Sequence, residues 1–148
     1  MDQATLPIEV HDAVAAVSAQ LRLRYLESAE PGLGFVAMAT LRHVIRKGPR
    51  TVSELAQLEQ VSTQAISLRI RPLVEDGLLM REPDPRDARR ALVRATPAGR
   101  RMVRRAEADA RRALWVAIDQ FGPTDRDALS AAVPLLLQIA QCLSKDTP

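Results

Sequence analysis

Arginines are the residues with the most evident chemistry in this chain, and they are concentrated over residues 81–112. That segment holds eleven arginines against five acidic residues, a local charge of +6, whereas the rest of the 148-residue chain carries −3. Guanidinium groups bind phosphate and carboxylate oxygens through paired hydrogen bonds. This asymmetry favours a surface for nucleic acid or another polyanion, and solvated helix faces are the alternative interpretation.

A helix predicted from residue 63 to about residue 76 has a polar face suited to reading DNA. Successive helical residues turn by about 100°, so Ile66, Ile70, Leu73 and Val74 share a buried face. The opposite face mixes amide, guanidinium and apolar groups, which match the groups exposed in a DNA major groove. An ordinary exposed helix face is the alternative. The predicted DNA contacts of this helix and its N-terminal cap are Ser62, Thr63, Gln64, Ser67, Leu68, Arg69 and Arg71.

The stretch DPRDARRALVRAT, residues 84–96, predicts a charged hairpin. A strand over 78–82, a turn over 83–87 and a returning strand over 90–95 fit its alternation and its turn residues. Arginine suits an adjacent minor groove, where negative potential is concentrated. We expect Asp84 and Asp87 to shape the turn, and a solvated turn with weak surface ion pairs is the alternative. The predicted DNA contacts of the hairpin are Arg86, Arg89 and Arg90.

The elements around these two segments are predicted to be helical. Apolar spacing indicates helices over 8–27 and 35–47, and Thr51-Val52-Ser53-Glu54 has the form of a capping box that starts a short helix burying Leu55 and Leu58. Thr96 caps a helix that runs from Pro97 to about residue 121. A last helix, capped by residues 124–127, carries Leu129, Val133, Leu136, Ala140 and Leu143 on one stripe, and Pro134 is expected to kink it.

This order of elements predicts a mainly α fold. Two short capped helices joined by a tight turn and followed by a hairpin make a winged helix-turn-helix with a two-stranded β wing. The long helices at both ends flank it, and they carry more apolar surface than one small module can cover.

Several function classes find no support in the sequence. A single cysteine, Cys142, rules out an internal disulfide and fits a reducing cytoplasm. No export signal and no membrane span are expected, because apolar runs stay short of about 20 residues. His11 and His43 lie far apart, so no metal site is predicted. We also expect no catalytic residues, no cofactor and no enzyme activity, because no nucleophile–base pair or phosphate-binding glycine loop is evident.

The stretch TVSELAQLEQVSTQAISLRIRPLVEDGLLMREPDPRDARRALVRATPAGRRM, residues 51–102, resembles the MarR family of bacterial transcription regulators. The resemblance implies a homodimer that binds a pseudo-palindromic operator in double-stranded DNA. It implies one MarR-type domain over 1–148, with a winged-helix lobe at 33–96 and dimerisation helices at 6–30 and 97–144. Ala95, where the family usually has leucine, and Pro72 in the reading helix depart from the family pattern.

The resemblance also implies a small aromatic or lipophilic effector bound between the lobe and the dimerisation helices. The residues placed to line such a crevice are Tyr25, Phe35, Met38, Arg42 and His43, and core packing or an exposed helix face is the alternative for each. The expected function is a dimeric, sequence-specific DNA-binding regulator, a repressor that the effector releases. The competing hypothesis is a winged-helix module for protein assembly without sequence-specific DNA binding.

Overall fold

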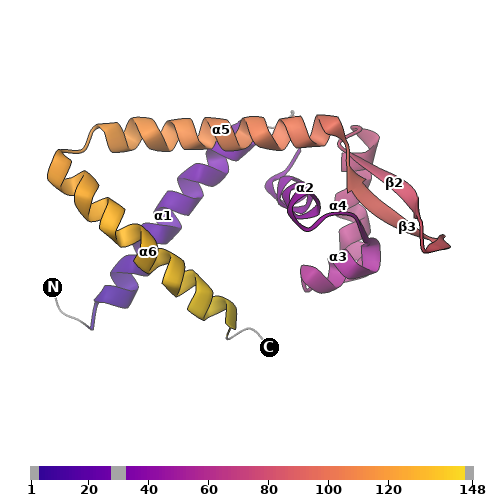
Figure 1. The fold of residues 1–148 in the computed structure, drawn as a ribbon, viewed down its shortest axis with the longest axis horizontal. Helices are drawn as coiled ribbons and strands as arrows, with labels where there is room; N and C mark the ends of the chain where they lie inside the picture. The colour runs from indigo at the N-terminus through magenta and orange to yellow at the C-terminus, as the bar shows by residue number, and fades with distance from the viewer. Residues whose placement is uncertain (1–3, 28–32, 146–148) are drawn as a thin grey trace. The chain divides into compact units, whose positions relative to one another are not determined.

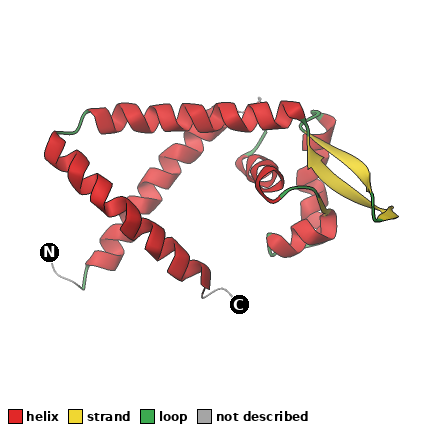
Figure 2. Ribbon diagram, viewed as in Figure 1, coloured by secondary structure: helices red, strands yellow, loops and turns green. Residues whose placement is uncertain are grey.

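The computed structural model describes residues 4–27 and 33–145, and within these residues the chain is mainly helical with one small sheet (Figures 1 and 2). The described residues fall into two compact units, one up to Ala110 and one from Arg111. The elements are α1 Leu6–Glu27, α2 Phe35–Lys47, β1 Arg50–Thr51, α3 Val52–Leu58, α4 Thr63–Glu75, β2 Leu79–Asp84, β3 Asp87–Ala95, α5 Pro97–Asp119 and α6 Pro123–Lys145.

The helix-turn-helix of α3 and α4 forms as predicted, with local caps at both helix starts. The Glu54 N–H donates to Thr51 Oγ1 at 3.3 Å, and the Thr51 N–H donates to Glu54 Oε2 at 2.8 Å, which completes the capping box. Ser62 caps α4 by accepting from the Ala65 N–H at 3.1 Å. Gln60 adopts a positive φ of 52°, which turns the chain sharply between the two helices.

The two-stranded hairpin of the wing forms as predicted from β2 and β3, and a short strand that was not predicted, β1, extends it to a three-stranded antiparallel sheet. The strand order is β1-β3-β2, and β1 pairs Arg50 with Val93 and Thr51 with Leu92. The turn is shorter than predicted, because β2 reaches Asp84 and β3 already begins at Asp87. The short β1 strand therefore joins the wing directly to the start of α3.

The hydrophobic core lies between α2, the helix-turn-helix, the sheet and the start of α5. Ile66, Ile70 and Leu73 of α4 are fully buried, and Val74 packs against them while partly exposed. The predicted burial of Leu58 is wrong, because this side chain is 43% exposed at the end of the seven-residue α3. The other buried apolar residues of this core are Leu33, Met38, Leu41, Val44, Leu55, Ala56, Leu78, Leu79, Val93, Ala95 and Val103.

The start of α5 is fastened to the residues that follow α4. The Thr96 hydroxyl accepts from the Gly99 N–H at 3.1 Å, which confirms Thr96 as the helix cap, and it also donates to the Gly77 carbonyl oxygen at 2.7 Å. The Thr96 N–H donates to the Leu78 carbonyl oxygen at 3.0 Å. A Cβ atom at Gly99 would overlap that same Leu78 oxygen, so only glycine allows the helix to approach this closely.

The last helix starts at Pro123, one residue earlier than the cap predicted over 124–127, and it continues through Pro134 to Lys145. Its predicted apolar stripe is mostly exposed within the described chain. Val133, Leu136 and Leu143 of this stripe are all exposed. The stretch Pro123–Ser144 is long and apolar enough to cross a membrane by length and composition alone. An exposed apolar helix that pairs with another subunit has the same composition, so this is weak evidence for a membrane span.

The Gly99 contact predicts a specific loss of stability. Alanine is favoured over glycine within a helix by about 1 kcal/mol, but overpacking against a backbone carbonyl costs about 1–3 kcal/mol. The added Cβ would overlap the backbone oxygen of Leu78, so the upper part of that cost range applies. We therefore expect Gly99→Ala to lower the free energy of unfolding by about 1–2 kcal/mol, measured by urea denaturation at one fixed protein concentration. Arg101→Ala, at an exposed position of the same helix, should change it by less than about 0.5 kcal/mol. A Gly99→Ala variant as stable as the unsubstituted chain would contradict the tight packing.

Candidate nucleic-acid interface

The face of α4 that points away from the core is exposed, as the helical periodicity predicts. Gln64 and Arg71 are exposed, and Leu68 is 65% exposed, an unusual position for a large apolar side chain. A groove of about 440 Å³ runs along this face. Its lining residues are Gln64, Ser67, Leu68, Arg71, Val74, Glu75 and, from β2, Arg81.

The N-terminus of α4 is open to solvent beside this groove. Ser62 and Thr63 are both exposed. The Ser62 hydroxyl oxygen already accepts the Ala65 N–H, so its remaining capacity is to donate its proton to an acceptor outside the chain. The unpaired N–H groups of the first helical turn and the helix dipole make this end suited to an anion.

Arg69 is engaged inside the protein, which sequence reasoning did not foresee. Its Nη1 atom donates to Glu59 Oε2 at 2.7 Å, and the side chain of Glu59 is only 13% exposed. Thr40 Oγ1 lies 3.5 Å from the same oxygen, and His43 Nδ1 lies 3.5 Å from Glu59 Oε1. Glu59 thus links α2, the end of α3, and α4. Phosphate binding by Arg69 stays a prediction. The partners come from 10 to 19 residues away, so no local pattern announces this cluster.

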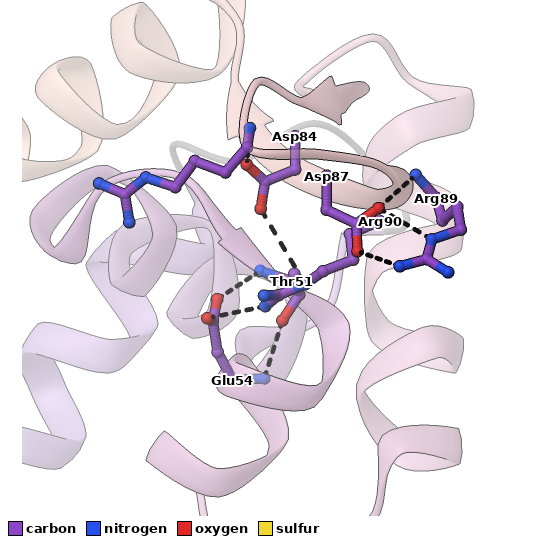
Figure 3. Close-up of polar contacts among 7 residues, drawn as sticks. Thr51, Glu54, Asp84, Asp87, Arg89 and Arg90 are labelled. Atoms are coloured by element: carbon purple, nitrogen blue, oxygen red, sulfur yellow. Dashed lines mark hydrogen bonds and ion pairs between the residues drawn. The ribbon is translucent and has the colours of Figure 1, made fainter.

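The two aspartates of the wing hold its turn, as predicted (Figure 3). Asp84 is buried and accepts the Arg86 N–H at 2.9 Å. Asp87 accepts the Arg89 N–H at 3.0 Å and the Arg89 Nε–H at 3.1 Å. The side-chain hydrogen bond from Arg89, followed by the backbone one, lowers the pKa of Asp87 below its usual value. The Arg89 side chain is nevertheless 91% exposed, so its guanidinium is oriented but still accessible.

Arg90 connects the wing to the helix-turn-helix. Its Nη2 atom donates to Glu54 Oε1 at 3.1 Å, and its Nε atom lies 4.0 Å from Asp84 Oδ2 (Figure 3). The hydrogen bond from the Thr51 backbone is the largest cause that lowers the pKa of Glu54, and the positive charge of Arg90 acts in the same direction. Arg90 is half exposed, and contact with DNA is a prediction that competes with these two carboxylates.

The residues expected to line an effector crevice come together only in part. Arg42 lies over the ring of Tyr25, 4.6 Å from its centre, and 3.7 Å from Glu107 of α5. Phe35 lies beneath Arg22 at 5.8 Å, while His43 faces Glu59. Met38 is 1% exposed and belongs to the core, so it lines no accessible surface in the described chain.

Comparison with known proteins agrees with this architecture. The model of the MarR family matches residues 32–90. Over these residues, which include α2 to β2, the chain is similar to the MarR family. An uncharacterized HTH-type transcriptional regulator of Mycobacterium leprae is similar to this chain at 29% identity, over 92% of this chain and 93% of the relative. These relatives are transcriptional regulators rather than enzymes.

Solved structures of transcriptional regulators share this fold over nearly the whole chain. A transcriptional regulator from Thermotoga maritima has 16% identity and a TM-score of 0.79, covering 94% of this chain and 99% of that one. A mutant MepR from S. aureus bound to an oligodeoxyribonucleotide has 15% identity and a TM-score of 0.69, covering 92% and 98%. At these identities the likeness shows the fold, including the winged helix and the flanking helices.

The Glu54–Arg90 pair predicts a pH-dependent contribution to stability. The folded state lowers the pKa of Glu54 below 4.5, so the stabilisation is present above pH 4.5 and is lost as the pH falls through the folded pKa. Glu54→Gln keeps an amide that can serve the capping box but removes the charge. We expect it to lower the free energy of unfolding by less than about 1 kcal/mol at pH 7, because the carboxylate is 40% exposed.

Urea denaturation at pH 7, 5 and 3.5 measures this difference, which should become smaller as the pH falls. Arg90→Ala and the double variant complete a cycle that isolates the pair from the capping hydrogen bonds. A difference between Glu54→Gln and the unsubstituted chain that stays constant with pH would show that the charge of Glu54 does not contribute.

Proposed function

We propose that this chain is a regulator of the MarR type, that it binds DNA sequence-specifically as a homodimer, and that it acts as a repressor that a small molecule releases. The observation that carries the DNA-binding proposal is the exposed face of α4. Gln64 and Arg71 supply donors and acceptors there, while Leu68 supplies an apolar contact that the protein itself leaves unused. These are the groups that distinguish base pairs in a major groove, where a thymine methyl suits an apolar side chain.

The wing supports the same proposal from a second element. Arg86 and Arg89 are exposed at its turn, whereas the carboxylates of Asp84 and Asp87 accept backbone N–H groups that hold the turn. In the proposed complex α4 enters the major groove and the wing lies on the neighbouring minor groove. The MepR structure with an oligodeoxyribonucleotide shares this fold, which supports the assignment.

The homodimer is proposed from apolar surface that the described chain leaves uncovered. No residue of α1 is buried, and the large apolar residues of α6 are exposed. We assign residues 6–30 and 97–144 to dimerisation and residues 33–96 to the DNA-binding lobe of a single domain over 1–148. Two-fold symmetry then requires a pseudo-palindromic operator in double-stranded DNA, with half-sites about 34 Å apart. The exposed apolar residues are Leu6, Ile8, Val14, Val17, Leu23, Leu114, Trp115, Val116, Val133, Leu135, Leu136, Leu137, Ile139 and Leu143.

Effector release is proposed from the Tyr25–Arg42 pair. An aromatic anion can stack on Tyr25, and its carboxylate can replace that of Glu107 as the partner of Arg42. Because these residues join α1, α2 and α5, the anion would shift the lobe relative to the helices that fix the spacing of the two reading helices. It releases DNA only to the extent that it prefers the incompatible arrangement. A regulator of this kind works in the cytoplasm, where the chromosome is accessible.

The wing assignment is tested with the duplex that the unsubstituted chain selects from random DNA. We expect the double variant Arg86→Ala, Arg89→Ala to bind this duplex at least tenfold more weakly in fluorescence anisotropy, because two charge-assisted contacts are lost in each protomer. Arg101→Ala, Arg104→Ala removes the same charge from exposed positions of α5 and should have a much smaller effect. Equal losses in both variants would contradict a specific role of the wing, and absence of any selected sequence would favour the protein-assembly hypothesis.

Effector release is tested with benzoate as the probe. We expect benzoate to weaken binding to the selected duplex by about 5–150-fold at saturation, the range typical of allosteric coupling. Arg42→Ala should abolish this response while still binding the duplex, whereas Arg46→Ala, on the same helix, should retain it. Release of DNA by benzoate at the same concentration from Arg42→Ala and from the unsubstituted chain would contradict this site.

A further inference from the structure

The groove along α4 contains one residue from outside the helix-turn-helix. Arg81 of β2 lines it together with the α4 residues Gln64, Leu68 and Arg71. The side chain is exposed. No turn or cap residues lie next to Arg81 in the sequence, unlike the wing arginines. Only the folded structure therefore shows that Arg81 lies at this groove.

The register of the sheet explains why Arg81 reaches this groove. Successive residues of a strand point to opposite faces, so Arg81 shares its face with Leu79, which is buried against the core. Its cross-strand partner is Val93, which is also buried on that face. The Arg81 side chain therefore projects from the face of the sheet that covers α4, and its guanidinium reaches solvent at the edge of the core.

The charge of Arg81 is not used within the described part of the chain. The two carboxylates nearest to it along α4 and β2 have other partners: Glu75 accepts from Arg71 at 3.0 Å, and Glu82 accepts from Arg94 at 2.6 Å. Among residues 4–27 and 33–145, no ion pair or hydrogen bond of the Arg81 side chain is found. Arg69, Arg89 and Arg90, by contrast, each contact a carboxylate.

The position of Arg81 along β2 places it at the edge of the α4 groove and away from the wing turn. It lies two residues beyond Leu79 at the base of the wing and three residues before Asp84 at the turn, about 10 Å along the strand from that turn. In the proposed complex α4 occupies a major groove and the wing turn occupies the adjoining minor groove. The sugar-phosphate strand that divides these two grooves must pass between α4 and the wing turn. Arg81 lies between α4 and the wing turn in the same way.

We propose that Arg81 binds a phosphate of the DNA strand that separates the two grooves, and so fixes the depth of α4 without reading a base. This inference rests on the proposed DNA-binding function. A guanidinium suits the task because it can bind two phosphate oxygens at once and is less strongly hydrated than a lysine ammonium. Phosphate contacts set the register of a protein on the duplex, whereas sequence is read at the base edges.

The test compares Arg81→Ala with the unsubstituted chain on two duplexes of equal length, the one selected from random DNA and a scrambled one. We expect Arg81→Ala to weaken binding to both by a similar factor, roughly tenfold per protomer. The slope of log K against log salt concentration should fall by about 1 per protomer, because one counterion fewer is released at each contact. Arg81→Lys should recover part of both quantities.

Two control variants separate this role from others. Arg101→Ala removes an equal charge from α5 and should leave the salt slope unchanged. Leu68→Ala should reduce binding to the selected duplex much more than to the scrambled one while keeping the salt slope. Circular dichroism and urea denaturation of Arg81→Ala check that the fold is retained.

Two results would overturn the assignment of Arg81. An unchanged salt slope in Arg81→Ala would show that the side chain meets no phosphate. A loss confined to the selected duplex, with an altered preference at one base pair, would show that Arg81 reads a base instead. If the unsubstituted chain itself does not distinguish the two duplexes, the proposed function fails, and this outcome is separate from both.

Discussion

The carbonyl oxygen of Leu78 is the point at which the parts of the DNA-binding lobe meet. It accepts the Thr96 N–H at 3.0 Å and lies against Gly99, so the end of β3 and the first turn of α5 are held against the residue that follows α4. The Thr96 hydroxyl adds a hydrogen bond to Gly77, which closes the same junction. The Leu78 N–H in turn donates to the Leu73 carbonyl oxygen of α4 at 2.8 Å, so this one residue connects the reading helix, the wing and α5.

Most of the wing arginines are compensated inside the protein, and this changes the meaning of the basic segment. Arg90 contacts Glu54 of α3 and so holds the sheet to the helix-turn-helix, whereas Arg94 contacts Glu82 and joins β3 to β2 within the sheet. Charge density alone would assign all of these arginines to a polyanion. Their partners divide them into residues that hold the fold and residues, such as Arg81, whose charge has no partner in the described residues.

The sequence allowed prediction of the features that depend on near neighbours. The capping box at Thr51, the Ser62 cap and the Thr96 cap each join residues three positions apart, and the exposed face of α4 follows from helical periodicity. The β1 strand was missed because two residues carry no periodic signal and their pairing depends on Val93, some forty residues away. The Glu59 cluster and the position of Arg81 were missed for the same reason, since tertiary packing and strand register create them. The burial of Leu58 was overestimated because α3 ends before that side chain can reach the core.

The pairing of Asp87 with Arg89 has a consequence for the thermodynamics of recognition. A free arginine side chain samples many rotamers, and fixing one at an interface costs about 0.5–1.5 kcal/mol in conformational entropy. Asp87 fixes both the backbone and the guanidinium of Arg89 when the chain folds, although the side chain remains 91% exposed. The conformational entropy of this side chain is therefore lost in folding rather than in association. The wing presents a partly preorganised cation, and less of its favourable binding enthalpy is cancelled by the entropy cost of ordering the side chain.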